Sequence, residues 1–197
     1  IAMLRDRDDG DCLFCGLVTG NVEGIARKKM RAVGILQTQA LSPPSEEQLL
    51  RTWAGYEDCA FLGGFGSDFC SGDVEDQSRI YKDRGEQLKI CVQRCINMLD
   101  PSTHELTRVV HVGDAVADVL AAKWCRESLD ASIRVGVVGV ATGKWSVEQL
   151  TAAISLDIPG SGVERKGKGG VFESIVLEDG INDPDFLEYC FPGSRGR

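Results

Sequence analysis

The stretch Arg108-Val-Val-His-Val-Gly-Asp-Ala-Val-Ala-Asp118 carries the clearest fold signal in this chain. Its apolar run over residues 109–112 is typical of a buried, parallel strand, and Gly113 allows a tight turn after it. Residues 114–125 then have the pattern of a helix. We therefore expect a strand-turn-helix unit of an α/β protein, with acidic side chains placed where the strand ends.

Two carboxylates follow this strand. Asp114 and Asp118 are four residues apart, so on a helix they would lie on the same side. Close carboxylates repel each other unless a cation lies between them, and hard oxygen ligands suit Mg²⁺. The pattern therefore predicts a magnesium site at Asp114 and Asp118. The simpler alternative is that Asp114 only caps the helix while Asp118 faces solvent.

A second strand signal precedes a possible phosphate-binding turn. The apolar stretch Leu13-Phe-Cys-Gly-Leu-Val-Thr19 is followed by Gly20 and Asn21, and residues 22–33 have a helical pattern. Backbone N–H groups at the start of a helix, together with its partial positive charge, favour a phosphoryl oxygen. Thr19, Gly20 and Asn21 are therefore candidate phosphate-binding residues.

Two further motifs lie between the possible phosphate-binding turn and the two acids: Gly63-Gly-Phe-Gly-Ser-Asp68 and Lys82-Asp-Arg84. The order resembles that of the haloacid-dehalogenase-like hydrolases, in particular the phosphoglycolate-phosphatase-like branch, over most of residues 13–150. The stretch Val135-Gly-Val-Val-Gly-Val-Ala-Thr-Gly143 resembles the last major strand of that family and the loop after it. Further along the chain we expect a helix over residues 146–153 and a terminal strand and turn over residues 170–179.

The resemblance implies a role for each motif. Thr19 matches the second motif, whose hydroxyl holds the phosphoryl group, with Gly20 and Asn21 beside it. Asp114 and Asp118 match the fourth motif, the acids that hold Mg²⁺.

The third motif of the family is a basic residue that offsets the charge of the phosphoryl group and the nucleophile. Arg84, expected at the start of a helix over residues 85–99, is the favoured match. Lys82 is the alternative. Lys28 and Lys29 are more distant candidates, because their position on a helix favours a solvated face.

The first motif of the family, a buried strand ending in Asp-x-Asp-Gly-Thr, has no clear match. Asp6-Arg-Asp-Asp-Gly-Asp11 follows a poor strand and leaves no room for a crossover helix, so we interpret it as a solvated turn. We expect the nucleophile strand and the cap to lie on a segment upstream of residue 1. The strands ending at Thr19 and Gly113 would then flank a gap of roughly 9–10 Å between strand axes. We expect the upstream segment to fill this gap. The alternatives are a strand from a second copy of the chain, or a collapse in which the two strands pair and the phosphate pocket is lost.

Together, the motifs predict a three-layer, Rossmann-like α/β core with a mostly parallel sheet. The implied function is Mg²⁺-dependent hydrolysis of a small phosphorylated metabolite through an aspartyl-phosphate. A non-catalytic phosphate-binding module is the alternative. A haloacid dehalogenase is less favoured because its chemistry needs no metal-binding acids. A response-regulator-like receiver is a poorer fit, because its acidic cluster should close the first strand.

Composition sets further limits. The 197 residues, 43% of them hydrophobic, suffice for one globular α/β domain over residues 1–197. A net charge of −8 argues against nucleic acid or an anionic membrane as a partner. No apolar stretch approaches the roughly 20 residues of a membrane span, and we expect a cytoplasmic protein.

Two segments and one pair of thiols complete the predictions. Residues 36–58 are expected to form an insertion, and residues 156–170 a glycine-rich, mobile loop. The chain has eight cysteines. Cys91 and Cys95, one helical turn apart, are expected to be reduced and to face the core.

Overall fold

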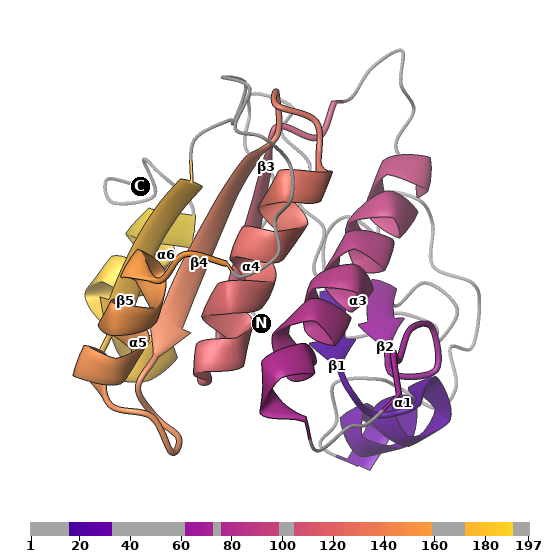
Figure 1. Cartoon of the computed structure of the whole chain (residues 1–197), viewed down its shortest axis with the longest axis horizontal. Coiled ribbons are helices and arrows are strands. Elements are labelled where there is room, and N and C mark those ends of the chain that lie inside the picture. Colours follow the sequence, from indigo (N-terminus) through magenta and orange to yellow (C-terminus); the bar gives the residue numbers. More distant parts are fainter. Residues whose placement is uncertain (1–15, 33–61, 73–75, 99–104, 159–171, 191–197) are drawn as a thin grey trace. The chain divides into compact units, whose positions relative to one another are not determined.

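The computed structural model describes residues 16–32, 62–72, 76–98, 105–158 and 172–190. Helices and parallel strands alternate along the chain (Figure 1), which confirms the α/β class. The Rossmann-like core of the haloacid-dehalogenase type stays a prediction. The acidic turn at residues 6–11 and the insertion at residues 36–58 lie outside the described residues, as does most of the glycine-rich segment.

The chain divides into two compact units. One contains Ile1–Cys70 and Ile90–Glu105, and the other contains Ser71–Lys89 and Leu106–Arg197. In the described part of the first unit, the elements are β1 (Gly16–Thr19), α1 (Glu23–Ala32), β2 (Leu62–Phe65) and the end of α3 (Gln77–Met98). Strands β1 and β2 are parallel, with Thr19 opposite Phe65. Thr19 therefore ends a strand, as predicted.

The glycines around β2 are explained by close contacts. A Cβ atom at Gly63 would collide with the ring of Phe65, which lies two residues further along the strand and is 1% exposed. A Cβ atom at Gly66 would collide with the backbone carbonyl of Gly20. The glycine-rich run thus lets the turn after β2 approach the turn after β1 at backbone distance.

The second unit contains a three-stranded sheet. Its elements are the start of α3, β3 (Arg108–Gly113), α4 (Val116–Ser128), β4 (Arg134–Val140), α5 (Val147–Ser155), β5 (Phe172–Leu177), η2 (Gly180–Asn182) and α6 (Pro184–Cys190). The strand order is β3-β4-β5, and both pairs are parallel. The strand, helix and terminal strand expected after residue 134 are therefore confirmed.

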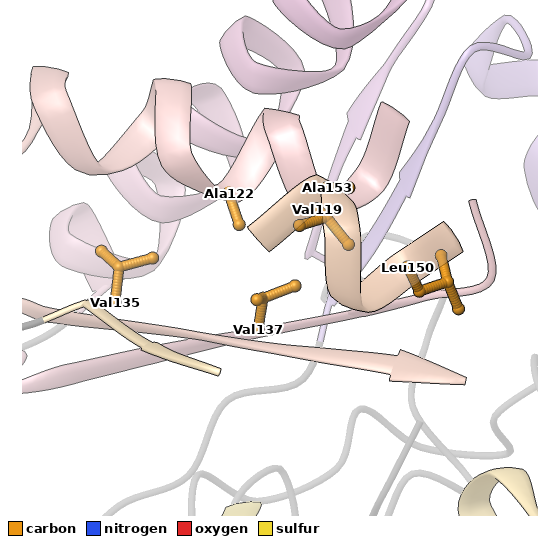
Figure 2. Packing of buried hydrophobic residues seen from close by; sticks show 6 residues of the cluster. All are labelled: Val119, Ala122, Val135, Val137, Leu150 and Ala153. Atoms are coloured by element: carbon orange, nitrogen blue, oxygen red, sulfur yellow. The ribbon is translucent and has the colours of Figure 1, made fainter. Parts of the chain in front are cut away.

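The core of this unit lies between β4 and two helices (Figure 2). Val135 and Val137 of β4 pack with four residues of α4 and α5: Val119, Ala122, Leu150 and Ala153. Residues of opposite parity on β4 face the other way. A Cβ atom at Gly136 would lie 3.0 Å from Oη of Tyr189 in α6. Helices therefore cover both faces of β4, so this unit has an α/β/α layering.

Strand β3 is less buried than its valines predict. Among the described strands it pairs only with β4, so one of its edges has no described neighbour, and its valines are half-buried. The buried residue of β3 is His111, which lies opposite Val137 and so faces α4. Strands β1 and β3 belong to different sheets, and Leu17 and Val110 are not paired.

Two helix starts differ from the predictions. Helix α3 begins at Gln77, not near residue 85, because Asp76 caps it: its carboxylate accepts hydrogen bonds from the backbone N–H and hydroxyl of Ser78, at 2.9 and 2.7 Å. Gly85 does not mark a helix start. It leaves room inside α3 for the indole of Trp124, which a Cβ atom there would strike. Helix α4 begins at Val116, two residues later than predicted.

Candidate functional site

The candidate site lies at the carboxyl end of β3, where the chain turns into α4. Asp118, in the first turn of α4, bends back so that its Oδ2 accepts a hydrogen bond from the backbone N–H of Ala115 at 3.2 Å. A Cβ atom at Gly113 would strike the Asp118 side chain. Gly113 therefore makes room for a carboxylate that packs directly against the end of the strand.

Asp118 forms an ion pair with Arg84. Nη1 of Arg84, in the third turn of α3, donates a hydrogen bond to Oδ1 of Asp118. The Asp118 side chain is 12% exposed and that of Arg84 32%. The simpler alternative, in which Asp118 faces solvent, is therefore wrong. The charge of Asp118 is balanced by the guanidinium of Arg84.

The contacts of Lys82 and Arg84 show which of these two basic residues of α3 pairs with Asp118. The ammonium of Lys82 lies 5.6 Å from the ring centroid of Trp124 and 5.8 Å from that of Tyr81. A cation held over aromatic faces is stabilised by packing there. Arg84, and not Lys82, is the residue that reaches the acid. Arg84 does so from inside the helix, not from its start as predicted.

A buried histidine completes the surroundings of Asp118. Nε2 of His111 lies 3.7 Å from Oδ1 of Asp118, beyond hydrogen-bond distance, and has no hydrogen-bond partner among the described residues. Burial by itself raises the pKa of Asp118, but His111 and Arg84 stabilise the carboxylate and together hold the pKa below its ordinary value. Asp118 is therefore an anion near neutral pH.

Asp114 has a different environment. It precedes the helix, its side chain is exposed, and its carboxylate has no hydrogen-bond or ion-pair partner within the described residues. It lies against Gly143, in the loop after β4. Asp114 does not cap α4, since the N-cap position is Ala115. The two acids are thus unlike: Asp118 is buried and paired, while Asp114 keeps its oxygens available.

This difference bears on the predicted metal. No three His, Cys, Asp or Glu side chains converge into a metal-binding group in the part of the chain that the structure describes. Both oxygens of Asp118 already accept hydrogen bonds. Mg²⁺ commonly takes one or two protein carboxylates and completes its shell with water or phosphate oxygens. Of the two predicted ligands, Asp114 keeps oxygens that could join such a shell, whereas both oxygens of Asp118 are engaged by Arg84 and Ala115.

The predicted phosphate-binding turn lies in the first unit. Oγ1 of Thr19 accepts hydrogen bonds from the backbone N–H of Asn21 at 3.2 Å and from its side-chain Nδ2 at 2.9 Å. The N–H of Asn21 is thus used inside the turn. Gly20 is open, with no atom within 4 Å of a Cβ placed there. Within the described residues, the hydroxyl hydrogen of Thr19 and the N–H of Gly20 have no acceptor, so both remain as donors for an anion.

The sequence interpretation missed three contributors to these sites. His111 was not among the predicted site residues, and its Nε2 lies 3.7 Å from Oδ1 of Asp118. Gly143 was matched only as part of a loop, and Gly85 as a helix start. The roles of both glycines depend on side chains far along the chain, which periodicity does not reveal.

Comparisons with protein-family models, curated proteins and solved structures give no match to this chain. Within the described residues, no helix combines the length and apolar character needed to cross a membrane.

Proposed function

We propose that this chain forms the core of an Mg²⁺-dependent phosphomonoester hydrolase resembling the haloacid-dehalogenase-like enzymes. The observation that carries the proposal is the difference between the two acids after β3. Asp114 is exposed and unpaired among the described residues, while Asp118 is buried and holds Arg84. A free carboxylate and an anchored guanidinium at the carboxyl end of a parallel sheet are the components that a phosphoryl-transfer site needs.

Each side chain then has a role. Asp114 would hold Mg²⁺, which when bound supplies positive charge to phosphoryl oxygens. Asp118 fixes the position of Arg84 through one N–H group, and the other guanidinium donors, which have no partner among the described residues, would bind a phosphoryl oxygen. By the resemblance, the hydroxyl of Thr19, in the first unit, would donate a hydrogen bond to a phosphoryl oxygen. Substrates are small phosphorylated metabolites.

The attacking carboxylate is not assigned to any described residue. By the resemblance it belongs to a first-motif strand, and the edge of β3 that lacks a described neighbour suits such a strand. A protein that binds phosphate but lacks this carboxylate would be the non-catalytic module. The two functions share the binding residues and differ only in turnover.

The metal assignment is tested by thermal unfolding with and without Mg²⁺. A ligand that binds only the folded state raises the unfolding temperature, and Asp114→Asn should remove most of this rise. Glu127→Gln is the matched control, because Glu127 is exposed in the last turn of the same helix. An equal Mg²⁺ effect in wild type and Asp114→Asn would contradict the assignment.

Catalysis is tested with an aryl phosphate on a protein that includes the first-motif segment. Arg84→Ala should lower Mg²⁺-dependent turnover by on the order of 10²-fold, since it removes a charged contact to the transition state. Lys82→Ala, two residues away on α3, should have little effect. Turnover that depends on Lys82 instead would reverse the assignment. Orthophosphate binding without turnover would identify the binding module.

A further inference from the structure

Two side-chain nitrogens lie near one oxygen of Asp118. Nη1 of Arg84 donates to Oδ1, and Nε2 of His111 lies 3.7 Å from the same Oδ1. The other oxygen, Oδ2, is held by the backbone N–H of Ala115. Arg84 therefore holds Oδ1, and the imidazole of His111 lies beside the same oxygen without a hydrogen bond to it.

The hydrogen-bonding capacity of the buried His111 imidazole is not fully used. Its side chain is 9% exposed, and Nε2 has no hydrogen-bond partner among the described residues. A buried polar atom without a partner is unfavourable, so native structures rarely keep one without a reason. The strand holds it there, because residues of odd number on β3 face α4 and bring the imidazole toward Asp118.

Arg84 has two tasks in the proposed function. It pairs with Asp118, and it must bind a phosphoryl group. Moving the guanidinium toward a second anion weakens the first pair, and a buried carboxylate that loses its partner is strongly destabilised. A second donor close to Oδ1 would remove this conflict. Nε2 of His111 needs to approach by only about 0.8 Å to reach ordinary hydrogen-bond distance.

We propose that His111 is a positioning residue that takes over Oδ1 of Asp118 whenever Arg84 leaves it. The exchange keeps Asp118 paired in both states and frees Arg84 to follow a bound anion. No other described side chain donates to this oxygen, and Lys82 is held over aromatic rings. The inference rests on the proposed function for the identity of the anion, a phosphoryl group, but the exchange itself can be tested without it.

The first test uses Arg84→Met, which removes the competing donor. The chain has two histidines, His104 and His111, so long-range ¹H–¹⁵N spectra of the imidazoles are simple, and His104→Gln assigns them. We expect the Nε2 signal of His111 in Arg84→Met to move to a hydrogen-bonded position, with a hydrogen on Nε2. Lys82→Met should leave it unchanged. An unmoved His111 signal in Arg84→Met would overturn the exchange.

The second test adds orthophosphate and Mg²⁺ to the wild-type protein. The same change in the His111 signal is expected. If Arg84→Met moves the signal and orthophosphate does not, the exchange stands and the proposed phosphate site fails.

Affinity provides an independent check. His111→Phe should weaken orthophosphate binding by on the order of tenfold, while His111→Gln, which can place an N–H near the Nε2 position, should retain it. In an Asp118→Asn background the two variants should bind alike, because the buried charge is gone. A loss of affinity with His111→Phe that persists in that background would show a merely structural role and overturn the proposal.

Discussion

The carboxylate of Asp114 lies beside Gly143, in the space that any side chain at position 143 would need. A Cβ atom at Gly143 would collide with Oδ2 of Asp114. Gly113 and Gly139 are opposite each other in the parallel pair of β3 and β4, so the loops that carry Asp114 and Gly143 leave the sheet at the same edge. The loop after β4 thus helps to set the position of the proposed metal ligand.

Gly143→Ala should therefore weaken Mg²⁺ binding without unfolding the protein. Asp114 is exposed, and its carboxylate can rotate away from the new methyl group, so the free energy of unfolding should change by less than about 0.5 kcal/mol. The rotation displaces the ligand oxygens. Titration calorimetry with Mg²⁺ and a urea melt measure the two effects. Unaltered Mg²⁺ affinity would show that Asp114 binds no metal in its present position.

Gly113→Ala should instead destabilise the fold. The new Cβ atom would strike Cβ of Asp118, which the backbone of α4 fixes, as well as Cγ. The expected cost is about 1–3 kcal/mol, as for other overpacked sites. Gly24→Ala is the control, because nothing lies within 4 Å of a Cβ there, and alanine should stabilise α1 by about 0.5–1 kcal/mol. A Gly113→Ala protein as stable as wild type would contradict the contact.

The elements that the sequence predicts well are those whose signal is local. The apolar run before Gly113 and the alternation of strand and helix after it are set by neighbouring residues. The parallel pairing of β3, β4 and β5 follows from the crossover helices. The position of Thr19 at the end of β1 and the helix capped by Ser146 were likewise predicted from neighbouring residues.

Predictions that depend on distant partners are less secure. The start of α3 was misplaced because Gly85 looks like a boundary, whereas its reason is Trp124, which lies 39 positions further along. The paired acids were expected to repel each other and require a cation. In the structure the guanidinium of Arg84, 34 positions earlier in the chain, supplies the positive charge beside Asp118, so a metal ion is not needed to balance this carboxylate. Side-chain periodicity carries no information about such contacts.

The buried cysteines of α3 should resist alkylation in the native protein. Cys91 and Cys95 are buried, as predicted, and burial raises the pKa of Cys91 to about 12 and that of Cys95 to about 11. Only the thiolate reacts readily, so both should remain unmodified near neutral pH. Iodoacetamide labelling followed by peptide mass spectrometry tests this, with exposed Cys70 as the reactive control. Fast native labelling of Cys91 would contradict the burial.

Arg94 and Asp68 should make the stability of the first unit depend on pH. Nη1 and Nη2 of Arg94 bind the two oxygens of Asp68 at 2.8 and 2.9 Å, and Nη1 also donates to the carbonyl of Gly63. The hydrogen bond from Arg94 is the main cause that lowers the pKa of Asp68 below 3.8. In the unfolded chain Asp68 titrates near that ordinary value, so above this pH the ion pair makes its full contribution to the free energy of unfolding. Its contribution is lost as the pH falls through the lower, folded pKa.

Arg94→Met should therefore cost about 1 kcal/mol near pH 7, a modest value because the Arg94 side chain is 39% exposed. The difference in the free energy of unfolding between Arg94→Met and wild type should become smaller as the pH falls below about 4. Urea unfolding of both proteins from about pH 7 to about pH 3 measures it, with Lys28→Met, an exposed lysine of α1, as the charge-matched control. Because Asp68 must be ionised for the pair to form, a constant difference over this range would mean that Arg94 stabilises the unit through Gly63 alone.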